Sequence, residues 1–389
     1  MAVTIKPRDA KELRQVVEWA LNDGATLDVR GTGSKLALGK PMQASQVLDI
    51  SGLSGVVDYA PEELVVTLRA GTPMREIEAL LAQRNQMLAF EPPDLGPLLG
   101  RAAGEGTLVG AVLGNLAGPR RLSAGAARDH LLGFSGVNGR GEAFKSGGKV
   151  MKNVTGYDLS KLLAGSWGTL AVLDEVSVKV LPAPDQTRTL LLLGLDDQAA
   201  VRAMCAAMGS SNEVSGAAHL PGRTALRIEG VAPSVEARLK GLRDLLADSG
   251  AKMEELGTLE SRTLWRDIRD VRGLIVAGDT VVWKISCPPT EGPGIAARIR
   301  AQRPTAQIVY DWSGGLLWLE LPPSVDADHA LVRGALGTTG GHAMLIRAPE
   351  DVRTSVPVFH PQSPALAALA QRVKESFDPK GLFNPGRMG

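Results

Sequence analysis

The stretch RGTGSKLALG, residues 30–39, follows a short strand pattern and gathers glycine, threonine, serine and lysine into one loop. Glycine allows positive φ and close approach of the backbone to another atom, and successive N–H groups in such a turn can form a concave anion site. The spacing matches neither common phosphate loop. The sixth position of a G-x-G-x-x-G fingerprint is Leu36, and Gly39-Lys40 is followed by Pro41 where a Walker loop needs serine or threonine. The loop alone is therefore compatible with a tight turn or with an anion site.

The composition of the whole chain indicates a globular protein with two domains. It has 389 residues, of which 44% are hydrophobic and 22% are charged, and a chain of this length usually divides into two domains. The formal net charge of +1 argues against a nucleic-acid-binding surface. The two cysteines, Cys205 and Cys287, are too few for a disulfide framework or an iron–sulfur cluster, so we expect buried, reduced thiols.

The sequence shows neither an apolar signal region nor a run of about 18 apolar residues, so a membrane span is not expected. We expect a cytoplasmic protein, with peripheral attachment to the inner membrane through partners as the alternative.

Local patterns predict an α+β fold in three parts. In the first part we expect a helix from Asp9 to about Asn22, a helix opening at Thr72-Pro73, and strands at 26–30, 46–50, 55–59, 63–69 and 170–180. The proline pair at 182–184 suggests a boundary, giving domains over 1–182 and 183–347 and a C-terminal segment over 348–389.

The segment 183–347 shows two rounds of a β-α-β-β-α pattern on either side of a connector near Trp265. The first round has strands at 187–193, 215–220 and 224–230 and helices at 197–208 and 233–249. The second has strands at 280–286, 306–311 and 316–321 and helices at 291–302 and 326–336, and a last strand follows at 343–347. We predict a mostly antiparallel sheet with helices on one face.

Two further glycine-rich runs stand out. In GTLVGAVLGNLAGPRR, residues 106–121, glycine recurs every four residues, and four glycines would cost a helix several kcal/mol, at roughly 1 kcal/mol each relative to alanine. A backbone laid along a flat or phosphorylated ligand explains the run better, and Asn115 adds a side-chain amide for ligand or loop hydrogen bonds. In the run 147–180, Lys152 and Tyr157 flank Gly156. Taken alone, Lys152 is compatible with a solvated surface charge and Tyr157 with a ring packed in the core.

Four runs, in this order, carry a family resemblance: RGTGSK (30–35), GTLVGAVLGNLAG (106–118), KNVTGYDLSKLLAGSWGTLAVL (152–173) and FDPKGLFNPGRM (377–388). Together they resemble the FAD-binding proteins of the vanillyl-alcohol-oxidase or PCMH type, and within these the FAD-binding subunits of bacterial glycolate oxidase. The resemblance implies a PCMH-type FAD-binding domain of two α/β subdomains, followed by an α+β cap domain with an antiparallel sheet.

The resemblance also implies which residues hold the cofactor. The first loop would wrap the pyrophosphate with Gly31, Thr32, Gly33, Ser34 and Lys35. The flavin and ribityl side would be lined by Thr107, Gly110, Ala111, Gly114 and Asn115. The adenosine half would lie along Gly156, Tyr157, Gly168, Thr169 and Val172, and the tail would bring Asn384 near the isoalloxazine edge. Some members of the family bind flavin covalently through a histidine in the first loop. This sequence has none there, so the FAD is expected to be non-covalent.

Oxidation of a 2-hydroxy acid by flavin needs a base for the hydroxyl proton and a cation for the carboxylate. Catalytic relatives carry a histidine-rich hairpin, roughly H-x-G-D-G-N-x-H, where this chain reads YDWSGGLLWLEL, residues 310–321. Both histidines are missing from it. No metal site is therefore expected, and the catalytic residues stay unassigned.

By resemblance, bacterial glycolate oxidase combines a catalytic FAD subunit, an FAD-binding subunit of this type and an iron–sulfur subunit. The implied role is to assist assembly or electron transfer in a complex that oxidises glycolate to glyoxylate. Two alternatives stay open: a self-sufficient FAD-dependent 2-hydroxy-acid dehydrogenase whose base is His342 or Tyr310, and a flavin-free assembly scaffold.

Several arginines are candidates for anion contacts. One group consists of Arg120, Arg121 and Arg128. It is compatible with a surface for an acidic partner, with phosphate contacts, or with a solvated face. Arg347 and Arg353 could hold a carboxylate or form ordinary ion pairs.

Overall fold

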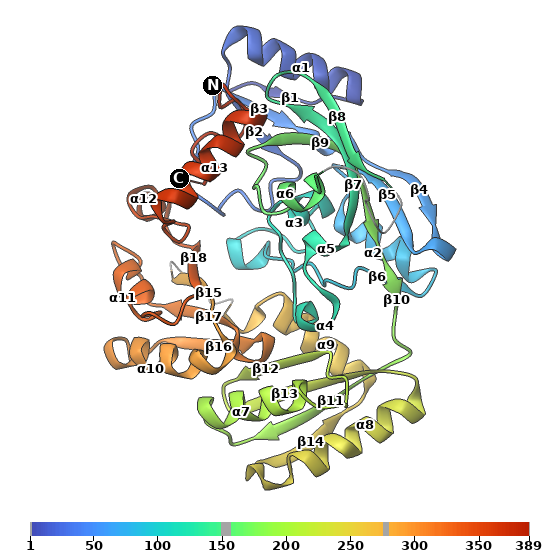
Figure 1. Cartoon of the computed structure of the whole chain (residues 1–389), viewed down its shortest axis with the longest axis vertical. Coiled ribbons are helices and arrows are strands. Elements are labelled where there is room, and N and C mark those ends of the chain that lie inside the picture. The colour runs from blue at the N-terminus through green and yellow to red at the C-terminus, as the bar shows by residue number, and fades with distance from the viewer. Residues whose placement is uncertain (1, 149–156, 275–279, 389) are drawn as a thin grey trace. The chain divides into compact units, whose positions relative to one another are not determined.

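The computed structural model describes residues 2–148, 157–274 and 280–388, and the chain forms two compact units within these ranges (Figure 1). The first unit is Met1–Ala117, Gly125–Ala183 and Pro361–Gly389; the second is Gly118–Ala124 and Pro184–His360. Two bounds differ from the sequence expectation. The second unit extends to residue 360 rather than 347, and it includes residues 118–124 from the end of the glycine-rich run.

A parallel sheet opens the first unit. Its order is β1-β3-β2, with β1 at Thr4–Ile5, β3 at Gln46–Asp49 and β2 at Leu27–Arg30. Helix α1 (Ala10–Asp23) begins where Asp9 accepts the N–H of Glu12 at 2.8 Å and ends at Gly24, whose φ is +69°. Its apolar stripe buries Leu13 and Val17 in the core that also holds strand β2, because these positions recur at helical spacing.

A second, antiparallel sheet follows in the same unit. Its order is β4-β5-β9-β7-β8, and the strands are β4 (Val56–Ala60), β5 (Val65–Arg69), β9 (Ala171–Lys179), β7 (Leu131–Asn138) and β8 (Ala143–Gly147). Helix α2 (Met74–Ala82) packs Ile77 and Leu81 into the shared core, and Pro73 is its N-cap. The remaining elements are β6 (Gln86–Met87), β10 (Leu181–Pro182), α3 (Leu108–Leu113), α5 (Ala127–His130) and α6 (Leu159–Leu163).

The C-terminal tail returns to the first strand region of this unit. After α13 (Pro364–Phe377), the carboxylate of Asp378 accepts the N–H groups of Leu382 and Phe383, both at 2.9 Å. Phe383 then forms a parallel bridge to Leu27, and the Asn384 N–H donates to the carbonyl of Leu27 at 2.9 Å. Residues at the two ends of the chain thus lie side by side.

The second unit is built on one antiparallel sheet. Among the described residues it has eight strands in the order β14-β11-β13-β12-β16-β17-β15-β18. The strands are β11 (Gln186–Leu193), β12 (Gly216–Leu220), β13 (Arg223–Gly230), β14 (Lys252–Leu256), β15 (Val281–Ser286), β16 (Gln307–Asp311), β17 (Leu316–Leu321) and β18 (His342–Arg347). This confirms the α+β fold with an antiparallel second domain.

Helices cover both faces of this sheet, rather than the single face expected. One face packs against α7 (Asp197–Met208), α8 (Ala232–Leu245), α10 (Gly292–Gln302), α11 (His329–Gly334) and α12 (Glu350–Ser355). The other face meets α9 (Thr258–Arg269), which buries Leu264, Trp265 and Ile268 against strands β11 to β13. The sequence treated this region as a connector, so both α9 and strand β14 were missed. Most residues of α9 are polar, so counting apolar positions at helical spacing did not identify this helix.

No helix in the described part of the chain is both long and apolar enough to cross a membrane.

Candidate functional site

An open cavity lies within the first unit and is bounded by segments from both ends of the chain. Its volume is about 660 Å³, counting the space at its mouth. The lining comes from the end of β2 and the loop after it, from α3 and its cap, from a turn before β9, and from the C-terminal tail. The residues are Val29, Arg30, Gly31, Thr32, Gly33, Ser34, Lys35, Leu36, Ile50, Thr107, Val109, Gly110, Leu113, Gly114, Trp167, Gly168, Asn384 and Arg387.

The first loop forms a tight turn that faces this cavity. Gly33 has a φ of +77°, and the N–H of Leu36 donates to the Gly33 carbonyl at 3.3 Å. The hydroxyl of Thr32 donates to the carbonyl of Glu105, which fixes the loop to the segment before α3. The tight turn expected from the sequence is therefore present, and it lines the cavity.

The second glycine run contains a short helix, although the sequence analysis favoured a backbone laid along a ligand over a helix. Thr107 caps α3 by accepting the N–H of Gly110 at 3.2 Å, and the helix ends at Gly114. Val109 and Val112 bury enough apolar surface to offset the low helix propensity of glycine. A Cβ on Gly110 would lie 3.1 Å from Thr107 Oγ1 and 3.5 Å from Lys35 Nζ, so this turn leaves no room for a side chain without displacing a neighbour.

Lys35 brings a positive charge to the cavity. Its half-buried ammonium packs against two glycines, since a Cβ on Gly106 would lie 3.4 Å from Nζ. It donates no hydrogen bond to any residue that the structure describes. Burial lowers the pKa of Lys35 to about 8, with Asp94 opposing this change and Arg387 adding to it. A desolvated cation without an acceptor suits an anionic ligand.

Asn384 joins three separate segments around the cavity. Its Oδ1 accepts the N–H of Val29 at 2.8 Å, and its Nδ2 donates to the carbonyls of Trp167 at 3.0 Å and Gly168 at 3.2 Å. Asn384 and Trp167 are both in the left-handed region, with φ of +45° and +55°. Asparagine tolerates this conformation and has both the acceptor and the donors that the junction needs.

Replacing Asn384 with alanine is expected to lower the free energy of unfolding by about 2–3 kcal/mol, because one buried and two partly buried backbone groups lose their partners. Chemical denaturation measures this, with Gln371→Ala on the exposed side of α13 as the control. Equal stability of the Asn384 variant and the parent would contradict the assigned role.

The predicted cofactor residues fall into two groups in the structure. Those that line the cavity are Gly31, Thr32, Gly33, Ser34, Lys35, Thr107, Gly110, Gly114, Gly168 and Asn384. Ala111 and Val172 lie in the apolar core, because their side chains point to the buried side of α3 and β9.

The remaining predicted residues have other roles or positions. Asn115 accepts the N–H of Arg128 at 3.1 Å, so its amide serves the loop. Thr169 donates to the carbonyl of Ser166 at 2.7 Å. Tyr157 is 90% exposed and lies outside the lining, while Gly156 and Lys152 fall outside the described residues.

Some lining residues escaped the sequence analysis. Arg387 donates to the carbonyl of Lys35 at 3.0 Å, and its guanidinium lies 6.0 Å from the centroid of the Trp167 ring. Trp167 is next to Gly168 in sequence and Arg387 is three residues from Asn384, and both of these neighbours were predicted site residues. Closeness in sequence to predicted site residues could therefore have identified Trp167 and Arg387. The others are Val29, Arg30, Leu36, Ile50, Val109 and Leu113, which read as ordinary strand or helix residues.

The histidine-poor hairpin of the second unit offers no base at Tyr310. This side chain is fully buried, and its hydroxyl donates to Asp197 at 2.6 Å. Burial and the Asp197 carboxylate raise the pKa of Tyr310 far above its ordinary value, which argues against the Tyr310 alternative. His342 is exposed, and burial of part of its ring, Lys284, His360 and Arg121 lower its pKa. Within the described ranges, no three histidine, cysteine or acidic side chains gather into a metal site.

The candidate arginines have different surroundings. Arg120 pairs with Glu229, Arg121 stacks on Trp312, and Arg128 belongs to the other unit. Arg347 pairs with Glu320 at 3.1 Å, and Arg353 donates to the carbonyl of Ala348 at 3.2 Å. The ordinary ion-pair interpretation therefore fits Arg347. Arg120, expected on a partner surface or a solvated face, is instead buried in an ion pair with Glu229.

Comparison with known proteins places this geometry in a class. Residues 1–147 match the family described as FAD binding domain. The fold is similar to that of p-cresol methylhydroxylase, with a TM-score of 0.76 at 12% identity, covering 99% of this chain and 88% of that one. An alkyldihydroxyacetonephosphate synthase has a TM-score of 0.69 at 15% identity, covering 98% and 76%. The matched domain and the fold define the class as FAD-binding proteins with the PCMH-type fold.

Curated relatives narrow the class. The chain is 35% identical over 379 residues to glycolate oxidase subunit GlcE of Escherichia coli (strain K12), covering 97% of both chains. It is also 30% identical over 190 residues to glycolate oxidase subunit GlcD of Bacillus subtilis (strain 168), covering 49% of this chain and 39% of that one. The chain belongs to the GlcE family of glycolate oxidase subunits.

Proposed function

We propose that this chain is the FAD-binding subunit of a complex that oxidises glycolate, and that it holds FAD with the pyrophosphate at the loop 31–35. The observation that carries the proposal is Lys35, a half-buried ammonium with no acceptor among the described residues, packed against glycines of the cavity wall. A diphosphate would supply the missing acceptors.

The residues of the cavity fit a dinucleotide in their chemistry. The lining combines a cation, hydroxyls and glycine backbone near the first loop with apolar side chains of Ile50, Val109, Leu113 and Trp167. The first group suits phosphates, and the second suits the flat rings and the ribityl chain. When bound, FAD supplies a hydride or electron acceptor, and the residues of this chain bind and orient it.

We propose that the flavin is non-covalent. Among the described residues that line the cavity there is no histidine, cysteine or tyrosine that could form a bond to the flavin ring. The visible spectrum of the purified chain, taken before and after acid precipitation, tests both cofactor proposals. Flavin bands that move to the supernatant support them. Bands that stay with the precipitate contradict the non-covalent bond, and a chain that stays colourless after incubation with FAD contradicts FAD binding.

The role in the complex is assistance with assembly or electron transfer, because the second unit lacks the histidine pair of the catalytic hairpin. The proposed partners are a catalytic FAD subunit and an iron–sulfur subunit, which would attach the complex peripherally to the inner membrane. Mixing the flavin-loaded chain with glycolate anaerobically tests whether this chain oxidises glycolate without its partners. We expect the flavin to stay oxidised in the isolated chain, and bleaching by glycolate alone would favour the self-sufficient dehydrogenase.

FAD binding should weaken as the pH rises through about 8. The ammonium form of Lys35 holds the diphosphate, and this form is lost above a pKa of about 8 in the ligand-free protein. We expect the dissociation constant to be about tenfold higher at pH 9 than at pH 7. A fluorescence titration at constant ionic strength measures this, and a flat profile would exclude Lys35 as the titrating group.

A further inference from the structure

Residues 379–388, which we call the strap, join two walls of the cavity. On one wall, the N–H of Lys40 donates to the carbonyl of Arg387 at 3.1 Å, and the Arg387 guanidinium donates to the carbonyl of Lys35 at 3.0 Å. On the other wall, the side-chain amide of Asn384 donates to two backbone carbonyls of the turn before β9, at 3.0 and 3.2 Å. Asn384 and Arg387 themselves line the cavity, so the strap is part of its wall.

An ion pair between Lys374 and Asp378, which we call the latch, stands at the beginning of the strap. Nζ of Lys374, in the last turn of α13, lies 2.6 Å from Oδ2 of Asp378. The same ammonium donates to the carbonyl of Thr169 at 2.6 Å and to the carbonyl of Phe383 at 3.4 Å. One side chain therefore links α13, the turn before β9 and the strap, and it uses all three of its donors to do so.

The carboxylate of Asp378 is buried and sets the first turn of the strap. Its oxygens accept the N–H groups of Leu382 and Phe383 as well as the Lys374 ammonium, and the side chain is 0% exposed. Gly139 packs directly against it, since a Cβ there would lie 2.3 Å from Oδ1. Any other course of the strap would leave buried polar groups without partners, which is costly.

The latch is connected to the cavity by the residues that follow it. Phe383 contacts the latch with its N–H and its carbonyl, and it also forms the parallel bridge to Leu27. Asn384 comes next, and Gly386, with φ of +75°, turns the backbone before Arg387. The direction in which the strap leaves Phe383 thus decides whether Asn384 and Arg387 reach their partners on the two walls.

We propose that the latch positions the ligand-binding wall of the cavity, because it holds the strap where Asn384 and Arg387 meet the other lining segments. Lys374 and Asp378 are positioning residues in this proposal. Neither of them lines the cavity, so their effect on a ligand passes through the strap. The identity of the ligand as FAD rests on the proposed function, whereas the link between latch and strap does not.

Amide hydrogen exchange of the flavin-free protein tests this link without the cofactor. Lys374→Met keeps the apolar stem and removes the three donors, so peptides covering 27–40 and 379–388 should exchange at least about tenfold faster than in the parent. Lys374→Arg keeps the charge and should retain most of the protection. Lys380→Met is the matched control, because it removes an exposed lysine from the strap itself and should exchange as the parent. Equal exchange in Lys374→Met and the parent would overturn the proposal.

Thermal unfolding identifies any variant that fails to fold. If Lys374→Met is one of them, Asp378→Asn decides, since it places an amide where the carboxylate accepts from Lys374 and from Phe383.

A double-mutant cycle on FAD affinity tests the positioning role. Lys374→Met and Arg387→Met should each raise the dissociation constant about tenfold. The double variant should bind little more weakly than Arg387→Met alone, because Lys374 acts through the strap. Additive effects would indicate a general loss of stability and overturn the positioning role. A parent that binds no FAD contradicts the proposed function alone, and the exchange experiment then decides on the latch.

Discussion

Lys35→Met is expected to weaken FAD binding by about 10- to 100-fold at pH 7, the range for losing charge-assisted hydrogen bonds to a diphosphate. Methionine keeps much of the length and apolar stem of lysine, so the wall formed with Gly106 and Gly110 keeps its shape. The change therefore isolates the charge. The dissociation constant follows from quenching of flavin fluorescence as the flavin-free protein is titrated with FAD.

The control for this prediction is Lys11→Met, on the exposed side of α1. It removes the same charge from the chain, so it separates a local contact from a general electrostatic effect. The Lys35 variant should also lose the pH dependence expected for the parent. An unchanged dissociation constant would show that the loop holds no phosphate.

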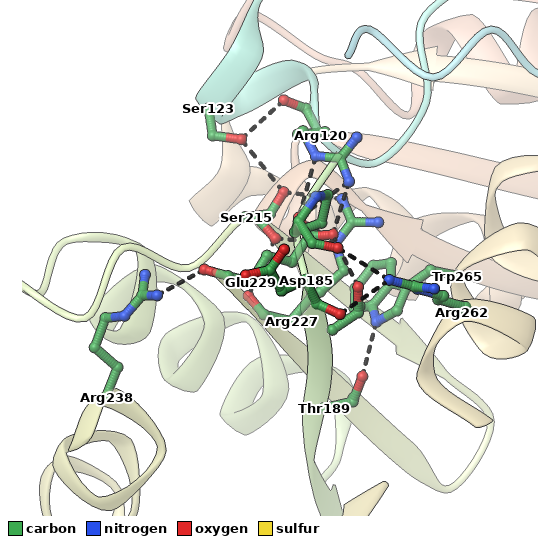
Figure 2. A network of polar contacts seen from close by, with 12 residues as sticks. Arg120, Ser123, Asp185, Thr189, Ser215, Arg227, Glu229, Arg238, Arg262 and Trp265 are labelled. Atoms are coloured by element: carbon green, nitrogen blue, oxygen red, sulfur yellow. Dashed lines mark hydrogen bonds and ion pairs between the residues drawn. The ribbon is translucent and has the colours of Figure 1, made fainter. Parts of the chain in front are cut away.

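Glu229→Gln is expected to lower the free energy of unfolding of the second unit by about 3 kcal/mol, since it removes the carboxylate charge that two buried arginines contact. Glu229 contacts Arg120 at 2.8 Å and Arg227 at 3.4 Å, and Figure 2 shows both guanidinium groups directed at its carboxylate. Arg120 and Arg227 are only 8% and 2% exposed, so water cannot replace the lost partner. Denaturation monitored by tryptophan fluorescence measures the loss, because Trp265 lies 4.6 Å from Arg227.

The pH dependence gives a second test of the same contact. Burial alone would raise the pKa of Glu229, but Arg227 and Arg120 lower it to about 2 from an ordinary value of 4.5. A lowered carboxylate pKa stabilises the fold at higher pH, and this contribution is lost as the pH falls from about 4.5 towards 2. Glu213→Gln is the control, because Glu213 is 78% exposed in its pair with Arg238 and should contribute little. Equal stability of the two variants would contradict the assigned role.

Local patterns predicted most elements of the fold to within a few residues. These elements depend on residues that are close in sequence. Examples are the Asp9 cap and the Gly24 end of α1, and the alternating strands of the second unit. The elements that were missed, β14 and α9, depend on burial against strands far away. Helix α3 was missed for a related reason, because packing of Val109 and Val112 outweighs the glycines around them.

The candidate site was predictable where it depends on backbone chemistry. A Cβ at residue 31, 110 or 168 would crowd a neighbouring side chain, so the glycine spacing marked those segments. Isolated side chains have no comparable sequence pattern. Arg387 and Trp167 were missed because arginine and tryptophan occur in many structural roles. The arginines at 120 and 121 show the converse, since they were predicted to share one surface, whereas Arg120 is buried in an ion pair with Glu229 and Arg121 lies over the ring of Trp312.

The sequence by itself determined the glycine-rich loops, the two-part α+β plan and the family, because these follow from local conformation and from residue types in fixed order. Tertiary structure alone decided which groups meet. Asn384 bonds Val29, which is 355 residues away, and Arg120 pairs with Glu229, 109 residues away. Such contacts depend on how sheets and loops return in space. Burial then lowers the pKa of Lys35, which supports its proposed function.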